Sequence, residues 1–159
     1  MTGNLTIREY EQCDRKAVEA CFNVLQELEH SLEIDRVQQD IGSPYVDYLL
    51  NKCVCHEGKI FVAELDNTIV GFSCMWIEEE ADSLITNLKR FAYFSDLVVL
   101  PKYRRKGVGS ALVQAREQYA KSKGLSHVLV NVLWRNQDMR AFITTKGFRE
   151  YELTYLKEL

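Results

Sequence analysis

The chain has 159 residues, of which 47% are hydrophobic and 27% charged, and its formal net charge is −3. We expect a single domain over residues 1–159, and the small negative charge argues against a nucleic-acid partner, which needs a basic surface. The first residues lack a basic start followed by an apolar run, and no stretch is long enough to span a bilayer. We therefore expect a cytoplasmic protein with no membrane partner.

Hydrophobic periodicity predicts the element order β-α-α-β-β-β-α-β-α-β. An alternating strand over residues 5–10 comes first. Two helices and then a hairpin with its turn at Asp66-Asn67 follow before residue 78. The later elements are a strand, helix, strand, helix and strand over residues 91–100, 108–124, 127–133, 136–146 and 148–156. This order predicts an α/β fold: a mixed central sheet of about six strands, with helices on both faces.

The cysteines and histidines do not form a metal-binding pattern. The five cysteines include one C-x-C and no C-x-x-C, and the three histidines are scattered. Cys53, Cys55 and His56 cluster, but alternate positions at a helix end point in different directions and no fourth ligand follows. We expect no metal site and five reduced thiols, several of them in the core.

The most informative segment joins the strand at 91–100 to the next helix. The strand ends at Pro101, and a basic run with two glycines leads directly into the helix. A helix N-terminus offers free N–H groups and a positive dipole end, and glycine lets the backbone approach a ligand closely. The segment predicts a site for a di- or triphosphate, made by Arg104, Arg105, Lys106, Gly107, Val108, Gly109 and Ser110.

The spacing of the glycines excludes two common phosphate motifs. A P-loop needs Lys-Ser or Lys-Thr after its last glycine, but Ser110-Ala111 follows Gly109, and the dinucleotide fingerprint needs a glycine where Leu112 stands. Arg104-x-x-Gly107-x-Gly109 instead resembles the pyrophosphate loop of the GNAT superfamily of N-acetyltransferases, which bind acetyl-CoA. The Leu-x-Val-x-Pro-x-Tyr spacing before it matches that family too.

A second segment, residues 131–148, is also similar to the family. It matches the family's Asn-x-x-Ala-x-x-Phe-Tyr-x-x-x-Gly-Phe element at four positions and differs at two. Met139 replaces the usual alanine, and Ile143 replaces a tyrosine that is the general acid in many members. The matches are Asn136, Phe142, Gly147 and Phe148.

The resemblance implies a fold, a cofactor and its contacts. The order of elements is the family's, except that members usually carry two strands after the last helix and only twelve residues follow Gly147 here. Acetyl-CoA would be the co-substrate, with its pantetheine arm and thioester beside the backbone of Leu97, Val98 and Val99. Asn136 and Phe142 would also contact it. Because Asn136 opens the last helix, it is also a candidate N-cap, and the two roles can coexist.

The resemblance further implies transfer of the acetyl group to a primary amine by direct attack in a ternary complex. Asp96 is the first candidate for the general base and Tyr93 a weaker one; a solvated strand end and a water chain remain alternatives. Strand periodicity would place Ser95 and Asp96 on opposite faces, so that only one meets the cleft. For the general acid, either no group is needed, because a CoA thiolate leaves readily, or a hydroxyl acts: Tyr93, Thr144, Tyr151 or Tyr155.

The segment between the first two helices would line the acceptor side of the cleft in this family. It holds one base, Arg36, against six acids: Glu27, Glu29, Glu33, Asp35, Asp40 and Asp47. An acidic rim favours a cationic small-molecule acceptor, although the same charges could simply solvate helix surfaces. A peptide or protein amine, or a CoA-binding module without catalysis, are the alternatives. We expect a monomer or a homodimer.

Overall fold

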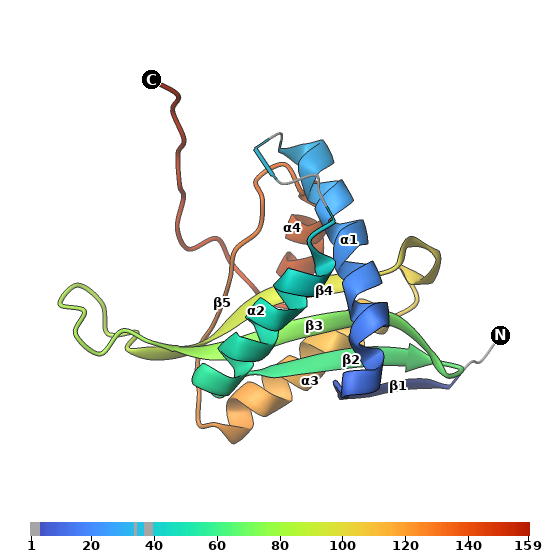
Figure 1. Cartoon of the computed structure of the whole chain (residues 1–159). Coiled ribbons are helices and arrows are strands. Elements are labelled where there is room, and N and C mark those ends of the chain that lie inside the picture. Colours follow the sequence, from blue (N-terminus) through green and yellow to red (C-terminus); the bar gives the residue numbers. More distant parts are fainter. Residues whose placement is uncertain (1–3, 34, 37–39) are drawn as a thin grey trace.

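The computed structural model describes residues 4–33, 35–36 and 40–159, so that residues 1–3 of the expected domain lie outside the description. Within these residues, five strands, four α-helices and two short 3₁₀ helices follow one another (Figure 1). Their bounds are β1 Leu5–Glu9, η1 Gln12–Asp14, α1 Arg15–Leu32, α2 Gly42–Cys55, β2 Lys59–Leu65, β3 Thr68–Glu79, β4 Arg90–Val99, η2 Pro101–Tyr103, α3 Val108–Ser122, β5 Val128–Val130 and α4 Gln137–Thr144.

The strands form one sheet in the order β1-β2-β3-β4-β5. The first four are antiparallel, and β5 is parallel to β4 because α3 carries the chain back across the sheet. The β2–β3 hairpin turns at Asp66 and Asn67, whose φ angles of 48° and 61° match the predicted two-residue turn. The mixed sheet that the sequence predicts is confirmed.

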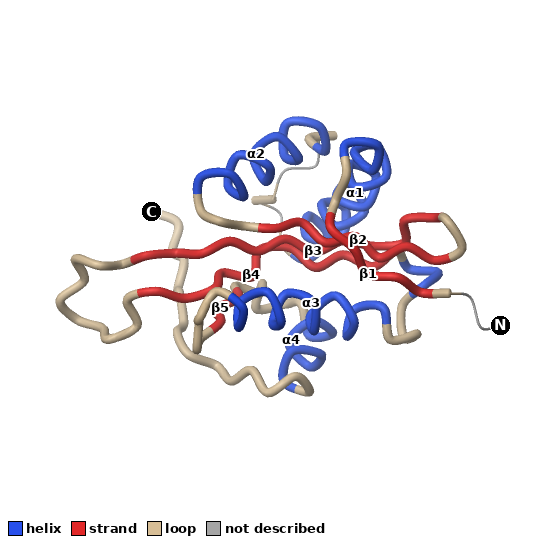
Figure 2. Tube along the Cα trace, turned by 90° about the horizontal axis from the view of Figure 1, so that it is seen from below, coloured by secondary structure: helices blue, strands red, loops and turns tan. Residues whose placement is uncertain are grey.

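Helices cover both faces of the sheet. α1 and α2 lie on one face, and α3 and α4 on the other (Figure 2). Successive residues of a strand point to opposite faces, so that β3 supplies both cores. Phe72 and Trp76 pack toward α1 and α2, while Met75 and Ile77 pack in the other layer with Phe94. None of the described helices is long and apolar enough to cross a membrane.

The C-terminal segment differs from the prediction. Residues 149–159 form no strand and are exposed throughout, so the sheet of the described residues has five strands rather than about six. The predicted strand at 127–133 is also shorter, pairing only over Val128–Val130. Alternation predicts which side chains of a segment share a face, but a strand also needs a partner for its backbone groups, and residues 149–159 have none within the described chain.

Candidate active site

A cleft opens where β4 and β5 stop pairing. The two strands pair only through residues 92–94 and 128–130, although β4 continues to Val99. Beyond this point side chains and backbone from five elements line a cavity of 70 Å³, which we call the β4–β5 cleft. Its lining residues are Leu25, Glu29, Ser95, Asp96, Leu97, Arg116, Val130, Asn131, Val132, Leu133, Asn136, Met139 and Ile143.

A β-bulge in β4 shapes one wall of this cleft. Ser73 pairs with Leu97 and Met75 with Phe94, so that Ser95 and Asp96 together lie opposite the single residue Cys74. The extra residue breaks the alternation of the strand. Ser95 and Asp96 therefore both line the cleft, and the expectation that they lie on opposite faces is wrong.

Asp96 is buried, with 6% of its surface exposed, and two hydroxyl groups contact its carboxylate. Ser95 Oγ donates to Oδ2 at 2.6 Å, and Tyr45 Oη lies 3.2 and 3.3 Å from the two carboxylate oxygens. Burial raises the pKa of Asp96, while the hydrogen bonds from Ser95 and Tyr45 and the charge of Arg116 oppose the rise. A carboxyl whose pKa is raised toward neutrality is a better proton acceptor than an exposed one.

Glu29 brings a second carboxyl to the cleft, from α1. Burial raises the pKa of Glu29; the positive charge of Arg36 opposes this shift and the negative charge of Asp96 adds to it. The sequence placed Glu29 only among six acids of a possible rim. Helical spacing could have shown which acids share a face of α1, but not that this face meets the bulge of β4.

Arg116, on α3, contacts the bulge from the face of the sheet opposite to α1 and α2 (Figure 2). Its Nη1 donates to the carbonyl oxygen of Asp96 at 3.2 Å and lies 3.5 Å from that of Cys74, and its guanidinium lies 4.1 Å from the centre of the Phe94 ring. Only 3% of the residue is exposed, and burial lowers its pKa to about 10. Arg116 thus donates to carbonyl groups on both strands at the point where the bulge disrupts their ladder. Sequence reasoning missed this residue, which appears as one polar position in an amphipathic helix.

The glycine loop lies at the end of β4. Gly107 is the N-cap of α3 with a φ of 84°, and the first helical hydrogen bond joins the N–H of Ala111 to the carbonyl of Gly107. The amides of residues 108–110 therefore precede the helical ladder and are available to a ligand. A Cβ built on Gly109 would meet nothing closer than Phe142 Cζ, at 3.5 Å. The loop can thus hold an anion on backbone donors at the positive end of α3.

The basic side chains of the loop are exposed. Arg104 Nε donates to the carbonyl of Val99 at 2.9 Å, which ties the loop to the end of β4. Arg105 has a φ of 60° and lies 3.9 Å from Asp138, and Lys106 lies 5.7 Å from the centre of the Tyr103 ring. All three cations therefore remain near the helix N-terminus.

Comparison with known proteins agrees with this geometry. The family model described as "Acetyltransferase (GNAT) family" matches residues 20–148. The chain belongs to the GNAT family. It is therefore an acetyltransferase.

Individual relatives support the same family and fold. An N-alpha-acetyltransferase of Sulfurisphaera tokodaii is 26% identical over 132 residues, which cover 81% of this chain and 78% of that protein. A mutant Bacillus halodurans protein of solved structure has a TM-score of 0.88 at 19% identity, over 97% of this chain and 99% of that one. An aminoglycoside N-acetyltransferase, AAC(6')-Iy, solved in complex with CoA, has a TM-score of 0.75 at 17% identity, over 100% and 97% of the two chains.

The remaining cofactor candidates of this GNAT protein lie on β4, in the first turn of α3 and at the N-cap of α4. Leu97 lines the cleft, Val98 is buried toward α1 and α2, and Val99 is half-buried beside Gly109. Asn136 Oδ1 accepts a hydrogen bond from the N–H of Met139 at 3.1 Å, which confirms the N-cap, and Asn136 also lines the cleft. Val108 is buried at the first position of α3, and Ser110 is half-buried one turn from the cap.

The candidates for acid–base chemistry lie in different parts of the structure. Tyr93 is half-buried, accepts a hydrogen bond from Asn131 Nδ2 at 3.2 Å, and is not among the residues that line the cleft. Burial raises the pKa of Tyr93. Ile143 does line the cleft, in the place where many GNAT members carry tyrosine, whereas Tyr151 and Tyr155 lie on the exposed C-terminal segment. Of these side chains, only Asp96 combines burial with direct access to the cleft.

The acids of the predicted rim have different surroundings. Asp47 pairs with Arg15 at 2.7 Å, and Asp40 accepts a hydrogen bond from Asn23 at 2.8 Å. Glu33 lies 3.8 Å from Arg135, while Glu27 and Asp35 are exposed. Glu29 is the one member of the six that lines the cleft. Among the described residues no group of three or more His, Cys, Asp and Glu side chains could hold a metal ion.

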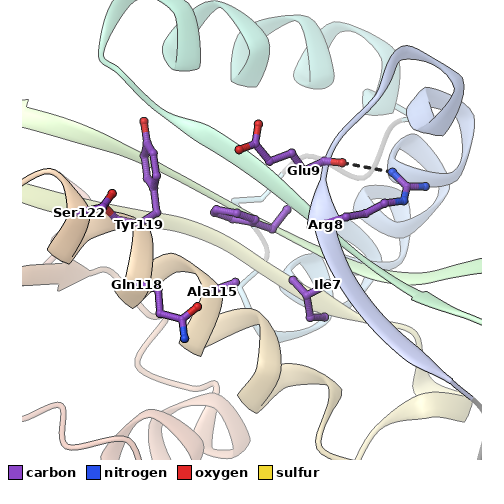
Figure 3. A pocket seen from close by; sticks show the side chains of 8 residues that line it. Ile7, Arg8, Glu9, Ala115, Gln118, Tyr119 and Ser122 are labelled. Carbon is purple, nitrogen blue, oxygen red and sulfur yellow. Dashed lines mark hydrogen bonds between the residues drawn. The ribbon is translucent and has the colours of Figure 1, made fainter.

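A larger hollow of 440 Å³ lies away from these residues, between the edge strand β1 and α3 (Figure 3). Ile7, Arg8 and Glu9 line it from the strand, and Ala115, Gln118 and Tyr119 from the helix. None of the predicted site residues belongs to its lining, and it is wide open to solvent. The smaller β4–β5 cleft, which is lined by the bulge residues Ser95 and Asp96, is therefore the candidate active site.

Proposed function

We propose that the chain transfers the acetyl group of acetyl-CoA to the primary amine of a cationic small molecule, by direct attack in a ternary complex. The observation that carries the proposal is that one strand, β4, holds both parts of the site. Its bulge at Ser95 and Asp96 forms a wall of the cleft, and its end at Val99 leads into the glycine loop. A ligand anchored by phosphates at the loop can therefore reach the cleft along a single strand.

The residues of the loop fit a pyrophosphate group. The amides of residues 108–110 precede the helical ladder, Gly109 leaves the approach open, and three cations lie nearby. We assign the phosphates of acetyl-CoA to residues 104–110 and its pantetheine arm to the backbone of Leu97, Val98 and Val99, with Asn136 and Phe142 alongside. Acetyl-CoA supplies an acyl group on a thiolate that leaves readily.

Side chains of the protein would carry out the proton transfer. Asp96 in its ionised form takes the proton of the incoming ammonium, so that the neutral amine can attack. Ser95 and Tyr45 donate hydrogen bonds to this carboxylate and hold it in place. Backbone N–H groups that β5 leaves unpaired beyond Phe94 are candidates to stabilise the tetrahedral oxyanion. The leaving thiolate needs no acid, which is consistent with Ile143 in the cleft.

The charge of the cleft favours a cationic acceptor. Glu29 and Asp96 both line it, and an ammonium group between two carboxyls would gain from each. Aminoglycoside N-acetyltransferases are among the proteins with a similar fold, and their name specifies a polycationic small molecule. The second candidate is a peptide or protein N-terminus, which the Sulfurisphaera tokodaii relative favours by its name, N-alpha-acetyltransferase. We further propose a cytoplasmic monomer or homodimer.

The test is an acceptor screen. The purified chain is incubated with acetyl-CoA and separate pools of polyamines, aminoglycosides and peptides, and CoA release is followed by liquid chromatography, because five protein thiols would react with a thiol reagent. We expect turnover with a cationic small-molecule pool and almost none with Asp96→Asn. Turnover with peptides alone would select the second candidate. Saturable acetyl-CoA binding without turnover in any pool would favour a non-catalytic module.

A further inference from the structure

Two cysteines outside the β4–β5 cleft form a thiol pair. Cys53 lies in the last turn of α2 and is half-buried, and Cys74 lies in β3 and is fully buried. Their Sγ atoms are 3.8 Å apart. The exposed thiols of Cys13 and Cys55 contact oxygen atoms of Glu11 and Asn51 instead, so this is the one thiol–thiol contact among the described residues.

The backbone around the pair is held in place by both elements. The N–H of Ile77 in β3 donates to the carbonyl of His56 at 2.9 Å, and the N–H of Gly58 donates to that of Cys53 at 2.8 Å. A Cβ on Gly58 would lie 2.9 Å from both Cys53 Cα and Trp76 Cβ, which shows how closely the end of α2 approaches β3. The sulfur separation of 3.8 Å must shorten by nearly half to reach the disulfide length of about 2 Å, and we expect side-chain rotation to supply this change.

The two thiols differ in a way that suits sequential oxidation. The hydrogen bond from Cys74 is the main cause of a lowered pKa at Cys53, and the charge of Lys59 also lowers it. Burial raises the pKa of Cys74, which keeps that thiol protonated and ready to donate to a Cys53 thiolate. Thiolates react with peroxides, whereas a buried thiol is protected from them. Of the two, Cys53 is therefore the thiol that a reagent in solution meets first.

We propose that Cys53 and Cys74 form a peroxide-sensitive dithiol site that closes to an intramolecular disulfide. The Cys53 thiolate attacks one oxygen of hydrogen peroxide, forming a sulfenic acid and releasing hydroxide. The Cys74 sulfur then attacks the Cys53 sulfur, the S–O bond breaks, and water leaves with the Cys74 proton. Two thiols are oxidised by two electrons and one peroxide is reduced.

The Cys53–Cys74 disulfide would lie close to Asp96, the candidate base, although neither cysteine lines the β4–β5 cleft. Cys74 lies opposite the Ser95–Asp96 bulge, and its carbonyl faces Arg116. Helix α2 also carries Tyr45, which contacts Asp96. A Cys53–Cys74 bond would thus tie α2 to the strand beneath the bulge. The formation of the bond itself does not depend on the proposed transfer reaction.

Peptide mapping tests the proposal directly. The folded chain is treated with hydrogen peroxide, blocked with an alkylating reagent and digested with trypsin without reduction. Cleavage after Lys52, Lys59 and Lys89 yields residues 53–59, with Cys53 and Cys55, and residues 60–89, with Cys74. We expect these two peptides to become linked, with a loss of about 2 Da from the intact monomer and a fall from five free thiols to three.

Matched variants identify which cysteines form the disulfide. Cys55→Ser, which changes the exposed neighbour in the same peptide, should leave the linked product unchanged, whereas Cys53→Ser should reduce it at least tenfold. Cys74→Ala, checked for folding by its melting curve, should leave Cys53 as a sulfenic acid that a dimedone probe captures. The proposal is overturned if Cys53 and Cys74 remain thiols while Cys13 and Cys55 oxidise, or if the linked product depends on Cys55.

Discussion

The two halves of the candidate site are built in different ways. Apart from Asn136 and Phe142, the half assigned to the cofactor is one continuous segment, residues 97–110, whose donors are mostly backbone amides at a helix N-terminus. The half assigned to the acceptor consists of side chains from separate elements: Glu29 from α1, Tyr45 from α2 and Asp96 from β4. A backbone site can therefore be recognised from a short sequence, whereas a side-chain site depends on how the helices pack against the sheet.

The largest expected effect comes from a change at Asp96, which should impair the acceptor half and leave the cofactor half intact. We expect Asp96→Asn to lower kcat for acetyl transfer by about 100- to 10,000-fold, because the amide cannot take a proton, while the Kd for acetyl-CoA changes little. Steady-state kinetics and calorimetry measure the two quantities. A variant with nearly unchanged kcat would remove Asp96 from the chemistry and favour a water chain.

The same variant has a distinct effect on stability. The pKa of Asp96 is raised in the folded state, so the native chain binds more protons than the unfolded chain between the two pKa values. The stabilising contribution of the neutral carboxyl is therefore present at low pH and lost as pH rises through the folded pKa. We expect Asp96→Asn to gain in melting temperature relative to the natural chain as pH is raised, and a gain that shrinks would contradict the burial of this charge.

In the cofactor half, Gly109→Val should weaken acetyl-CoA binding about 100-fold or more. The φ of Gly109 is not in the left-handed region and a Cβ has ordinary contacts there, so that the fold should survive while the side chain blocks the phosphates. Gly107 could not serve, because its φ of 84° would strain any replacement. Calorimetry on a variant with an unchanged melting curve decides the point, and an unchanged Kd would mean that the phosphates bind elsewhere.

Tyr45→Phe should have an intermediate effect on the acceptor half. The change removes a hydrogen bond that lowers the pKa of Asp96, so the acid limb of the pH–rate profile should move to higher pH and the rate below that limb should fall about tenfold. Tyr48→Phe on the same helix is the control, because Tyr48 is exposed. Equal shifts in both variants would show that Tyr45 acts only through packing.

Glu29→Gln tests whether the cleft or the whole rim attracts the acceptor. We expect kcat/KM for a cationic acceptor to fall about five- to tenfold, while the Kd for acetyl-CoA is unaffected, because one of two carboxyls facing the ammonium is lost. Glu27→Gln, an exposed change on the same helix, should have little effect.

Joint charge reversal at Glu33 and Asp35 should lower kcat/KM for a cationic acceptor only at low salt, because exposed charges act by steering. A neutral best acceptor, insensitive to all three changes, would exclude the cationic class.

The smallest effect is expected at Ile143. Replacing it with tyrosine would restore the hydroxyl that many GNAT members use as a general acid, in a residue that lines the cleft. Because a CoA thiolate leaves readily, we expect kcat to change less than about tenfold, equivalent to about 1.4 kcal/mol of barrier. A much larger gain would show that the natural chain lacks an acid that it could use.

Predictions from the sequence succeeded where the signal was local. The β2–β3 turn at Asp66 and Asn67, the start of α3 directly after the glycine loop and the N-cap at Asn136 all follow from residue types at fixed positions in a turn or helix end. The prediction failed for the strand at 148–156, where apolar and polar residues alternate but the backbone pairs with no other described strand. It also failed for the faces of Ser95 and Asp96, because a bulge depends on the partner strand.

The sequence by itself determined the family and the order of the elements as far as α4, and it predicted an anion site at residues 104–110, because each of these signals lies in neighbouring residues. Only the tertiary structure decided that Glu29, Tyr45 and Asp96 meet, that Arg116 supports the bulge, and that Cys53 contacts Cys74. The Tyr45–Asp96, Arg116–Asp96 and Cys53–Cys74 contacts join residues that are 20 to 51 positions apart in the chain. Their distances depend on helix packing and strand register, which no local pattern encodes.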